Sequence, residues 1–71
     1  MNNRILASAV LDVVNDEGGN VATYRVTVTG AGAASGRTKV YDIREDNEDS
    51  AAMEAIHRFT EEVENDLRAG A

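Results

Sequence analysis

The chain has 71 residues with seven basic and 13 acidic side chains, a net charge of −6, and neither cysteine nor proline. A chain of this length forms one domain, residues 1–71, and buries only about 60% of its unfolded surface. Without cysteine it has no disulfide or thiolate metal site, and no segment is apolar enough to span a membrane. We therefore expect a small cytoplasmic protein.

The negative charge is concentrated in the second half of the chain. Residues 1–40 carry four basic and three acidic side chains, whereas residues 41–71 carry three basic and ten acidic ones. Net charge steers association more than it selects a fold, so this asymmetry predicts an acidic surface that selects a basic partner. The same charge disfavours direct binding to nucleic acid, because the phosphates would repel it.

Residues 4–14 fit two structures. As a strand, this segment places Leu6, Val10 and Val14 on one face with Ser8 and Asp12, and alternating apolar residues on the other. As a helix, it would align its polar residues at a spacing of four. Its β-branched residues, and the turn-forming residues 15–20 that follow, favour the strand.

Two further strands are predicted. Residues 21–29 alternate between apolar residues and Thr or Arg, the period of two that is typical of a half-buried strand, and residues 37–43 form a second candidate. Between them, residues 30–36 consist of Gly, Ala and Ser only. We expect a mobile hairpin loop there, because no side chain is large enough to anchor it. The spacing of its glycines matches neither phosphate-binding pattern.

Residues 48–68 are predicted to form an amphipathic helix. Its apolar stripe at three- and four-residue spacing comprises Met53, Ile56, Phe59, Thr60, Val63 and Leu67, with Ala52 beside it. Asn47, Asp49 or Ser50 can cap the start, and Gly70 suits the position just past the end.

These elements predict an α+β fold: a two-layer βββα domain in which a three-stranded antiparallel meander carries one C-terminal helix on one face. The helix is expected to cover Ala22, Tyr24, Val26 and Val28, with Ala7 and Ala9 allowing close approach. The other face of the sheet stays open and half apolar. If residues 4–14 were helical, the fold would be αββα.

No catalytic, cofactor or metal site is predicted. The acidic segment 42–50 lacks the oxygen and glycine positions of an EF-hand loop, and His57, the single histidine, has no serine and carboxylate at a spacing that predicts a triad. We therefore expect no cofactor and no enzymatic activity. An enzyme with a site built across a dimer interface is the least favoured alternative.

The predicted function is recognition of a protein with a basic surface. The residues expected to bind this partner are Asp42, Glu45, Asp46, Glu48, Asp49, Glu54, Glu61, Glu62 and Asp66. The open face is expected to form a homodimer interface through Leu6, Val10 and Val14. The mechanism would be electrostatic steering with a modest apolar anchor.

Two forms of this function are considered. In size and charge the chain is similar to small acidic phage inhibitors of bacterial defence, anti-CRISPR proteins among them, which implies a decoy whose carboxylates imitate phosphates. In its predicted order of elements it is similar to antitoxins of the HicB kind, which implies a dimeric regulatory or assembly subunit. The first resemblance rests on bulk properties and the second on the order of elements, and no motif residue identifies a family.

Overall fold

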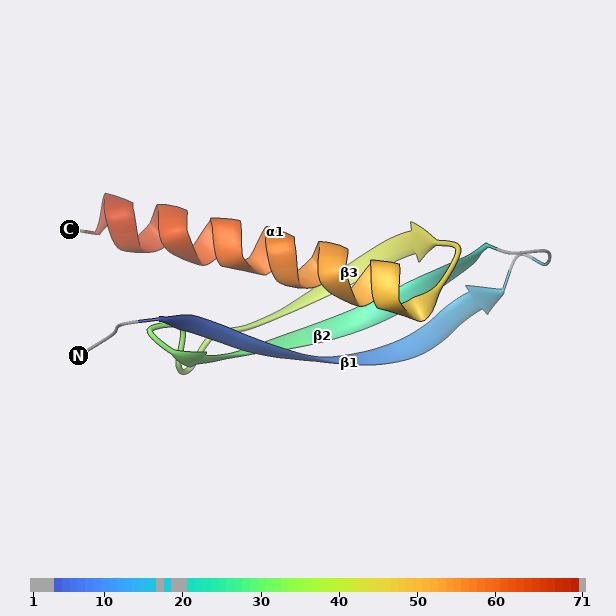
Figure 1. The fold of residues 1–71 in the computed structure, drawn as a ribbon, viewed down its shortest axis with the longest axis horizontal. Helices are drawn as coiled ribbons and strands as arrows, with labels where there is room; N and C mark the ends of the chain where they lie inside the picture. Colours follow the sequence, from blue (N-terminus) through green and yellow to red (C-terminus); the bar gives the residue numbers. More distant parts are fainter. Residues whose placement is uncertain (1–3, 17, 19–20, 71) are drawn as a thin grey trace.

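Three strands followed by one helix build the domain (Figure 1). The computed structural model describes residues 4–16, 18 and 21–70. The strands are β1 (Ile5–Asp16), β2 (Ala22–Gly32) and β3 (Thr38–Glu45), and the helix is α1 (Glu48–Ala69). The order β1-β2-β3 is an antiparallel meander. The predicted βββα fold is therefore confirmed, including a strand at residues 4–14. Part of the turn predicted at 15–20 lies outside the described residues.

The pairing of β1 with β2 follows the predicted alternation of side chains between the two faces of the sheet from Ile5 to Val13, where a β-bulge interrupts it. Asp12 pairs with Arg25 and Val13 with Tyr24, but the next pair joins Asn15 to Thr23. Val14 is the extra residue, so Asn15, not Val14, takes the open-face position beside Thr23. The predicted alternation is therefore wrong at Val14, because a bulge places two residues of one strand opposite one of the other.

The helix begins at a side-chain cap. The Asn47 side chain accepts a hydrogen bond from the Ser50 amide at 2.8 Å, while its backbone is extended. Of the three capping residues that were considered, the structure therefore selects Asn47. Glu48 and Asp49 lie in the first turn, where the helix dipole favours negative charge, and the Gly70 amide bonds to the Asp66 carbonyl oxygen at the other end.

One stripe of the helix packs on the sheet. Its buried residues recur every four positions: Ala51, Ala55, Phe59 and Val63. They meet β2 at Val26 and Val28, which are fully buried, and β3 at Ile43. Met53 and Leu67 were predicted in the stripe but are 71% and 43% exposed. The buried stripe is therefore rotated about the helix axis relative to the predicted stripe, because Ala51 and Ala55 let the first half of α1 approach the sheet closely.

The loop between β2 and β3 is held in place rather than mobile. Ala34 is fully buried, and its amide and carbonyl bond to Ala31 and Arg37. The Ala33 amide donates to the Arg4 carbonyl at 2.9 Å, which ties the loop to the start of β1. The predicted mobility is wrong because a methyl group is enough to anchor this loop: Gly30 leaves room for Ala34 directly against Phe59.

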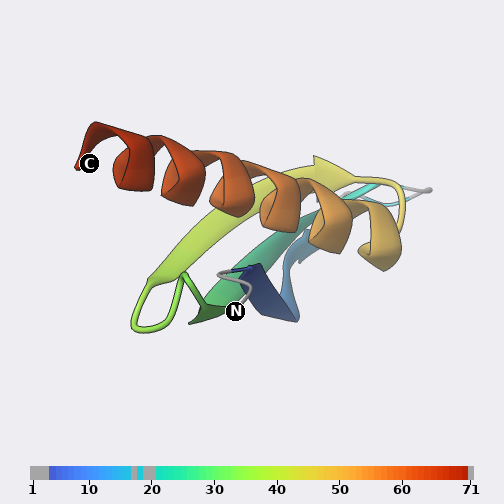
Figure 2. The ribbon, with the colours of Figure 1, turned by 60° about the vertical axis from the view of Figure 1, so that its left-hand side comes forward.

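The molecule is elongated, with principal extents of 45 × 20 × 15 Å. The helix runs along one face of the sheet, and no described element covers the other (Figures 1 and 2). In the described part of the chain, no helix has the length and apolar character needed to cross a membrane.

Candidate functional site

The two ends of the molecule differ in how their carboxylates are paired. At one end, β1 and β3 finish and α1 starts (right in Figure 1). Asp16 and Glu45 pair with the same β2 residue, Ala22, so the two strands bring these carboxylates to one row about 10 Å apart. We call this surface the acidic end, and its members are Asp16, Glu45, Asp46, Glu48 and Asp49.

The carboxylates of the acidic end are exposed, apart from the half-buried Glu45. Within residues 4–16, 18 and 21–70, none of them forms an ion pair with a basic side chain. Their remaining contacts are local. Asp46 accepts a hydrogen bond from the side-chain amide of Asn47 at 2.9 Å, and Asp16 accepts one from the backbone amide of Gly18 at 2.9 Å. At Glu48 and Asp49 the helix dipole also favours the negative charge.

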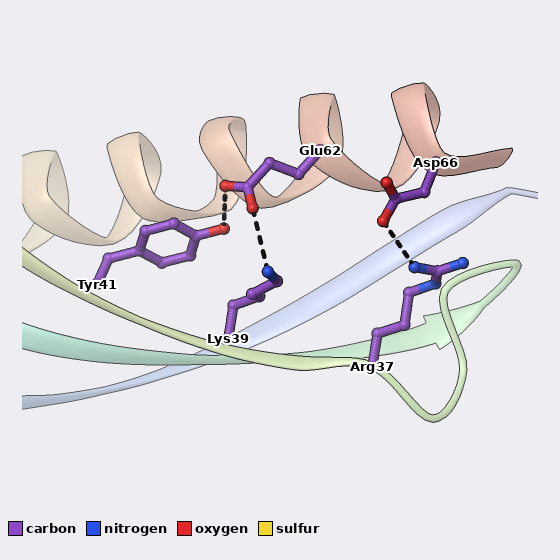
Figure 3. Close-up of polar contacts among 5 residues, drawn as sticks. All are labelled: Arg37, Lys39, Tyr41, Glu62 and Asp66. Carbon is purple, nitrogen blue, oxygen red and sulfur yellow. Dashed lines mark hydrogen bonds and ion pairs between the residues drawn. The ribbon is translucent and has the colours of Figure 1, made fainter. Parts of the chain in front are cut away.

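The opposite end of the helix is neutralised from within the fold (Figure 3). Arg37, just before β3, donates to Asp66 at 3.0 Å, and the Lys39 ammonium lies 3.5 Å from Glu62. The other Glu62 oxygen accepts from the Tyr41 hydroxyl at 2.7 Å. Residues 37–41 thus place a cation or a hydroxyl beside each of these two carboxylates, which are paired within the domain.

Tyr41 is the residue whose titration the fold changes most clearly. Partial burial raises the pKa of its phenol to about 12, and the hydrogen bond to Glu62 and the charge of that carboxylate act in the same direction. Ionising Tyr41 would place two negative oxygens 2.7 Å apart.

We expect this contact to make the fold sensitive to alkaline pH. Since an unfolded tyrosine titrates near pH 10, the contribution of Tyr41 to stability is fully present below about pH 10 and is lost as the pH rises towards about 12. Phenolate absorbance, recorded for the wild type minus Tyr41→Phe, should show a midpoint near 12, and Glu62→Gln should lower it. A midpoint at about 10 in the wild type would contradict the contact.

Other predicted partner-binding carboxylates are also paired within the fold. Asp42 accepts from Arg25 across the open face at 3.0 Å, and this hydrogen bond, followed by the charge of Asp42, raises the pKa of Arg25. On the helix, Glu54 pairs with Arg58, and Glu61 lies 2.6 Å from His57. These contacts are solvent-exposed and contribute little to stability, but the two arginine–carboxylate pairs reduce the net charge of their surfaces.

The nine residues predicted to bind a partner therefore fall into two groups. Glu45, Asp46, Glu48 and Asp49 gather at the acidic end, whereas the other five take part in internal contacts: Asp42, Glu54, Glu61, Glu62 and Asp66. Asp16 joins the first group and was not predicted, because only the strand register brings it to Glu45. The sequence could have indicated this position. A hairpin turn at residues 15–20 followed by a third antiparallel strand brings the end of the first strand and the end of the third to the same edge of the sheet.

The open face carries exposed apolar side chains beside a row of charged ones. Leu6 and Val10 are exposed there, and Val40 of β3 lies in one row with Val10, on the far side of Thr27. The next row along the strands is Asp12–Arg25–Asp42. Val40 was not predicted as part of this face, although its alternation with Ile43 and Tyr41 in the sequence would have placed it there.

Metal binding and acid–base chemistry depend on how the histidine and the carboxylates are grouped. Within them, no three histidine or carboxylate side chains lie close enough to hold a metal ion. His57 is exposed, and its carboxylate neighbour Glu61 is exposed too, so this pair lacks the water-shielded environment that proton transfer uses. Comparison with protein-family models, characterised proteins and solved structures finds no significant match.

Proposed function

We propose that this protein is a non-enzymatic binding module whose acidic end docks on a basic surface of another protein. The observation that carries the proposal is the uneven pairing of carboxylates: Asp66 and Glu62 pair with Arg37 and Lys39, whereas those of the acidic end form no ion pair with any basic side chain that the structure describes. An uncompensated, exposed cluster projects a field that steers a cationic partner.

The favoured form of this function is that of a decoy. Enzymes that handle nucleic acids hold the phosphates in cationic grooves, and a narrow end with five carboxylates could occupy such a groove. The elongated shape supports this form, because the acidic end lies at one extremity of a body with principal extents of 45 × 20 × 15 Å. Partners of this kind are found in the cytoplasm, which is where we place the protein.

The decoy function can be tested by competitive capture from a cell lysate. The immobilised wild-type chain should retain a nucleic-acid-binding protein, and added double-stranded DNA should displace it, because both ligands need the same groove. Replacing Glu45 by Gln and Asp46 by Asn should abolish most of the capture. These substitutions keep the size of each side chain and lie before the first helical turn, so the fold should be unaffected.

The matched control removes the same charge elsewhere. Glu61→Gln together with Glu64→Gln also raises the net charge by two, at exposed helix positions outside the acidic end. This control should capture as the wild type does. An equal loss of capture with both double variants would mean that only the net charge of the chain matters. Full capture by the Glu45/Asp46 variant would refute the acidic end as the binding surface. A captured protein that DNA fails to displace would argue against the decoy form alone.

A further inference from the structure

The exposed apolar residues of this chain are concentrated on one strand. Of the seven large hydrophobic side chains that are exposed among the described residues, four belong to β1: Leu6, Val10, Val13 and Val14. They do not share a face, because Val10 points to the open side and Val13 to the helix side, where it is 59% exposed. A partner on the open face alone would leave Val13 uncovered. A partner at the edge of the sheet would cover both faces.

We infer that the β1 edge pairs antiparallel with β1 of a second copy of this chain, giving a continuous six-stranded sheet. This inference goes beyond the proposed function and does not depend on it. β1 lies at one edge of the sheet and β3 at the other. β3 has four charged residues among its eight, a common protection of an edge, whereas β1 has only Asp12 and Asp16 among its twelve.

The backbone of β1 presents alternate amides to this edge. The Gly30 amide bonds to Arg37 on the β3 side, so the amide of Thr29, the residue before it, faces β1 and its partner Ser8. The bond from the Ala33 amide to the Arg4 carbonyl follows the same alternation. Even-numbered residues of β1 therefore bond to β2, and the amides of Ala7, Ala9 and Leu11 face away from it.

The side chains select one register for the pairing. A two-fold axis perpendicular to the sheet keeps matching faces together, so open-face residues must lie opposite open-face residues. With the axis at Val10, Asp12 lies opposite Ser8 of the second copy, whose hydroxyl can donate to the carboxylate. Shifts by two residues in either direction would place Asp12 opposite Leu6 or Val10. A further shift in one direction would oppose two Asp12 side chains, and in the other it would place Asp12 opposite Arg4 but leave Val13 beyond the paired stretch.

On the helix side, the same register pairs complementary sizes. Val13 lies opposite Ala7 of the second copy, and Leu11 lies opposite Ala9. The bulge at Val14 ends the regular stretch just beyond these pairs. The helix contacts all three strands, so the two helices would lie on the same face, separated by about three strand spacings, or 14 Å, which avoids a clash.

This arrangement also suits the charge. Because the strands are antiparallel, the two acidic ends point in opposite directions, which minimises repulsion between two chains of charge −6. The resulting dimer would present two acidic ends, one at each extremity.

Sedimentation velocity over a micromolar to millimolar range tests the dimer, and three lysine substitutions test its geometry. Val13→Lys alters only the β1 edge, Val40→Lys only the open face, and Val10→Lys both. Each makes the chain less negative, so a loss of dimer cannot come from added repulsion between net charges. We expect Val10→Lys and Val13→Lys to weaken the dimer at least about tenfold and Val40→Lys to leave it unchanged. Circular dichroism should show each variant folded.

Amide hydrogen exchange provides a readout that does not depend on the variants. The amides of Ala7, Ala9 and Leu11 should become protected as the protein concentration rises, whereas those of Ser8 and Val10 should be protected throughout. A wild-type chain that stays monomeric over the whole range would overturn the inference. So would a dimer that survives Val13→Lys and is lost with Val40→Lys, which would identify pairing through the open face instead.

Discussion

Replacing Phe59 by alanine should bring the domain close to unfolding at room temperature. Phe59 is the largest of the fully buried side chains, so its loss should cost about 3–5 kcal/mol. The whole domain, at the usual stability per residue, has only about 4–10 kcal/mol to lose. Urea unfolding followed by circular dichroism measures this difference directly.

Met53→Ala is the matched control, because it removes a large apolar side chain from the same helix. Met53 is mostly exposed, so we expect a change within about 0.5 kcal/mol. A loss at Met53 as large as that at Phe59 would mean that α1 is rotated relative to the sheet, with the stripe that the sequence predicted facing the core.

Gly30→Ala should be the second most damaging change. A Cβ atom at this position would lie 2.2 Å from the Ala34 carbonyl oxygen and 2.9 Å from the Phe59 ring. Replacing glycine normally stabilises a protein by about 0.4–1 kcal/mol, because the unfolded chain loses freedom. Here the sign should reverse, with a loss of about 1–3 kcal/mol, since the loop must move away from the core to make room. Thermal unfolding gives the sign and the size.

Gly70→Ala provides the comparison. The backbone at Gly70 is in the right-handed helical region, which alanine adopts freely, and its nearest contact would be the Asp66 carbonyl oxygen at 3.3 Å. Little change in the melting temperature is expected there. If Gly30→Ala were as harmless as Gly70→Ala, the loop after β2 would be mobile and the packing of Ala34 on the core would be wrong.

The fold could be predicted because its signals are local. Alternation in residues 21–29 and the apolar stripe of residues 48–68 each report the secondary structure of their own segment. What failed depends on contacts between segments. Met53 and Phe59 lie in the same sequence pattern, and only the approach of Ala51 and Ala55 to the sheet decides which of them is buried. Likewise, an alanine in a glycine-rich loop carries no sign that it will reach the core.

The negative charge of the candidate site could be predicted from the sequence, but its location on the fold could not. The excess of carboxylates after residue 40 is plain in the sequence. Their compensation is not, because Arg37 and Lys39 are 29 and 23 residues away from Asp66 and Glu62, the carboxylates that they meet. Asp16 reaches the acidic end by a similar long-range pairing. Counting charges along the chain therefore placed the binding surface over the whole helix, whereas pairing across the fold leaves it at one end.

The salt dependence of affinity for the captured partner tests the role of the acidic end most directly. If the uncompensated carboxylates provide the attraction, affinity should fall with rising salt, and Glu45→Gln with Asp46→Asn should lower the affinity at low salt and flatten this dependence. The Glu61→Gln and Glu64→Gln control should keep the wild-type slope. Identical slopes for the wild type and the Glu45/Asp46 variant would show that the partner is held by another surface.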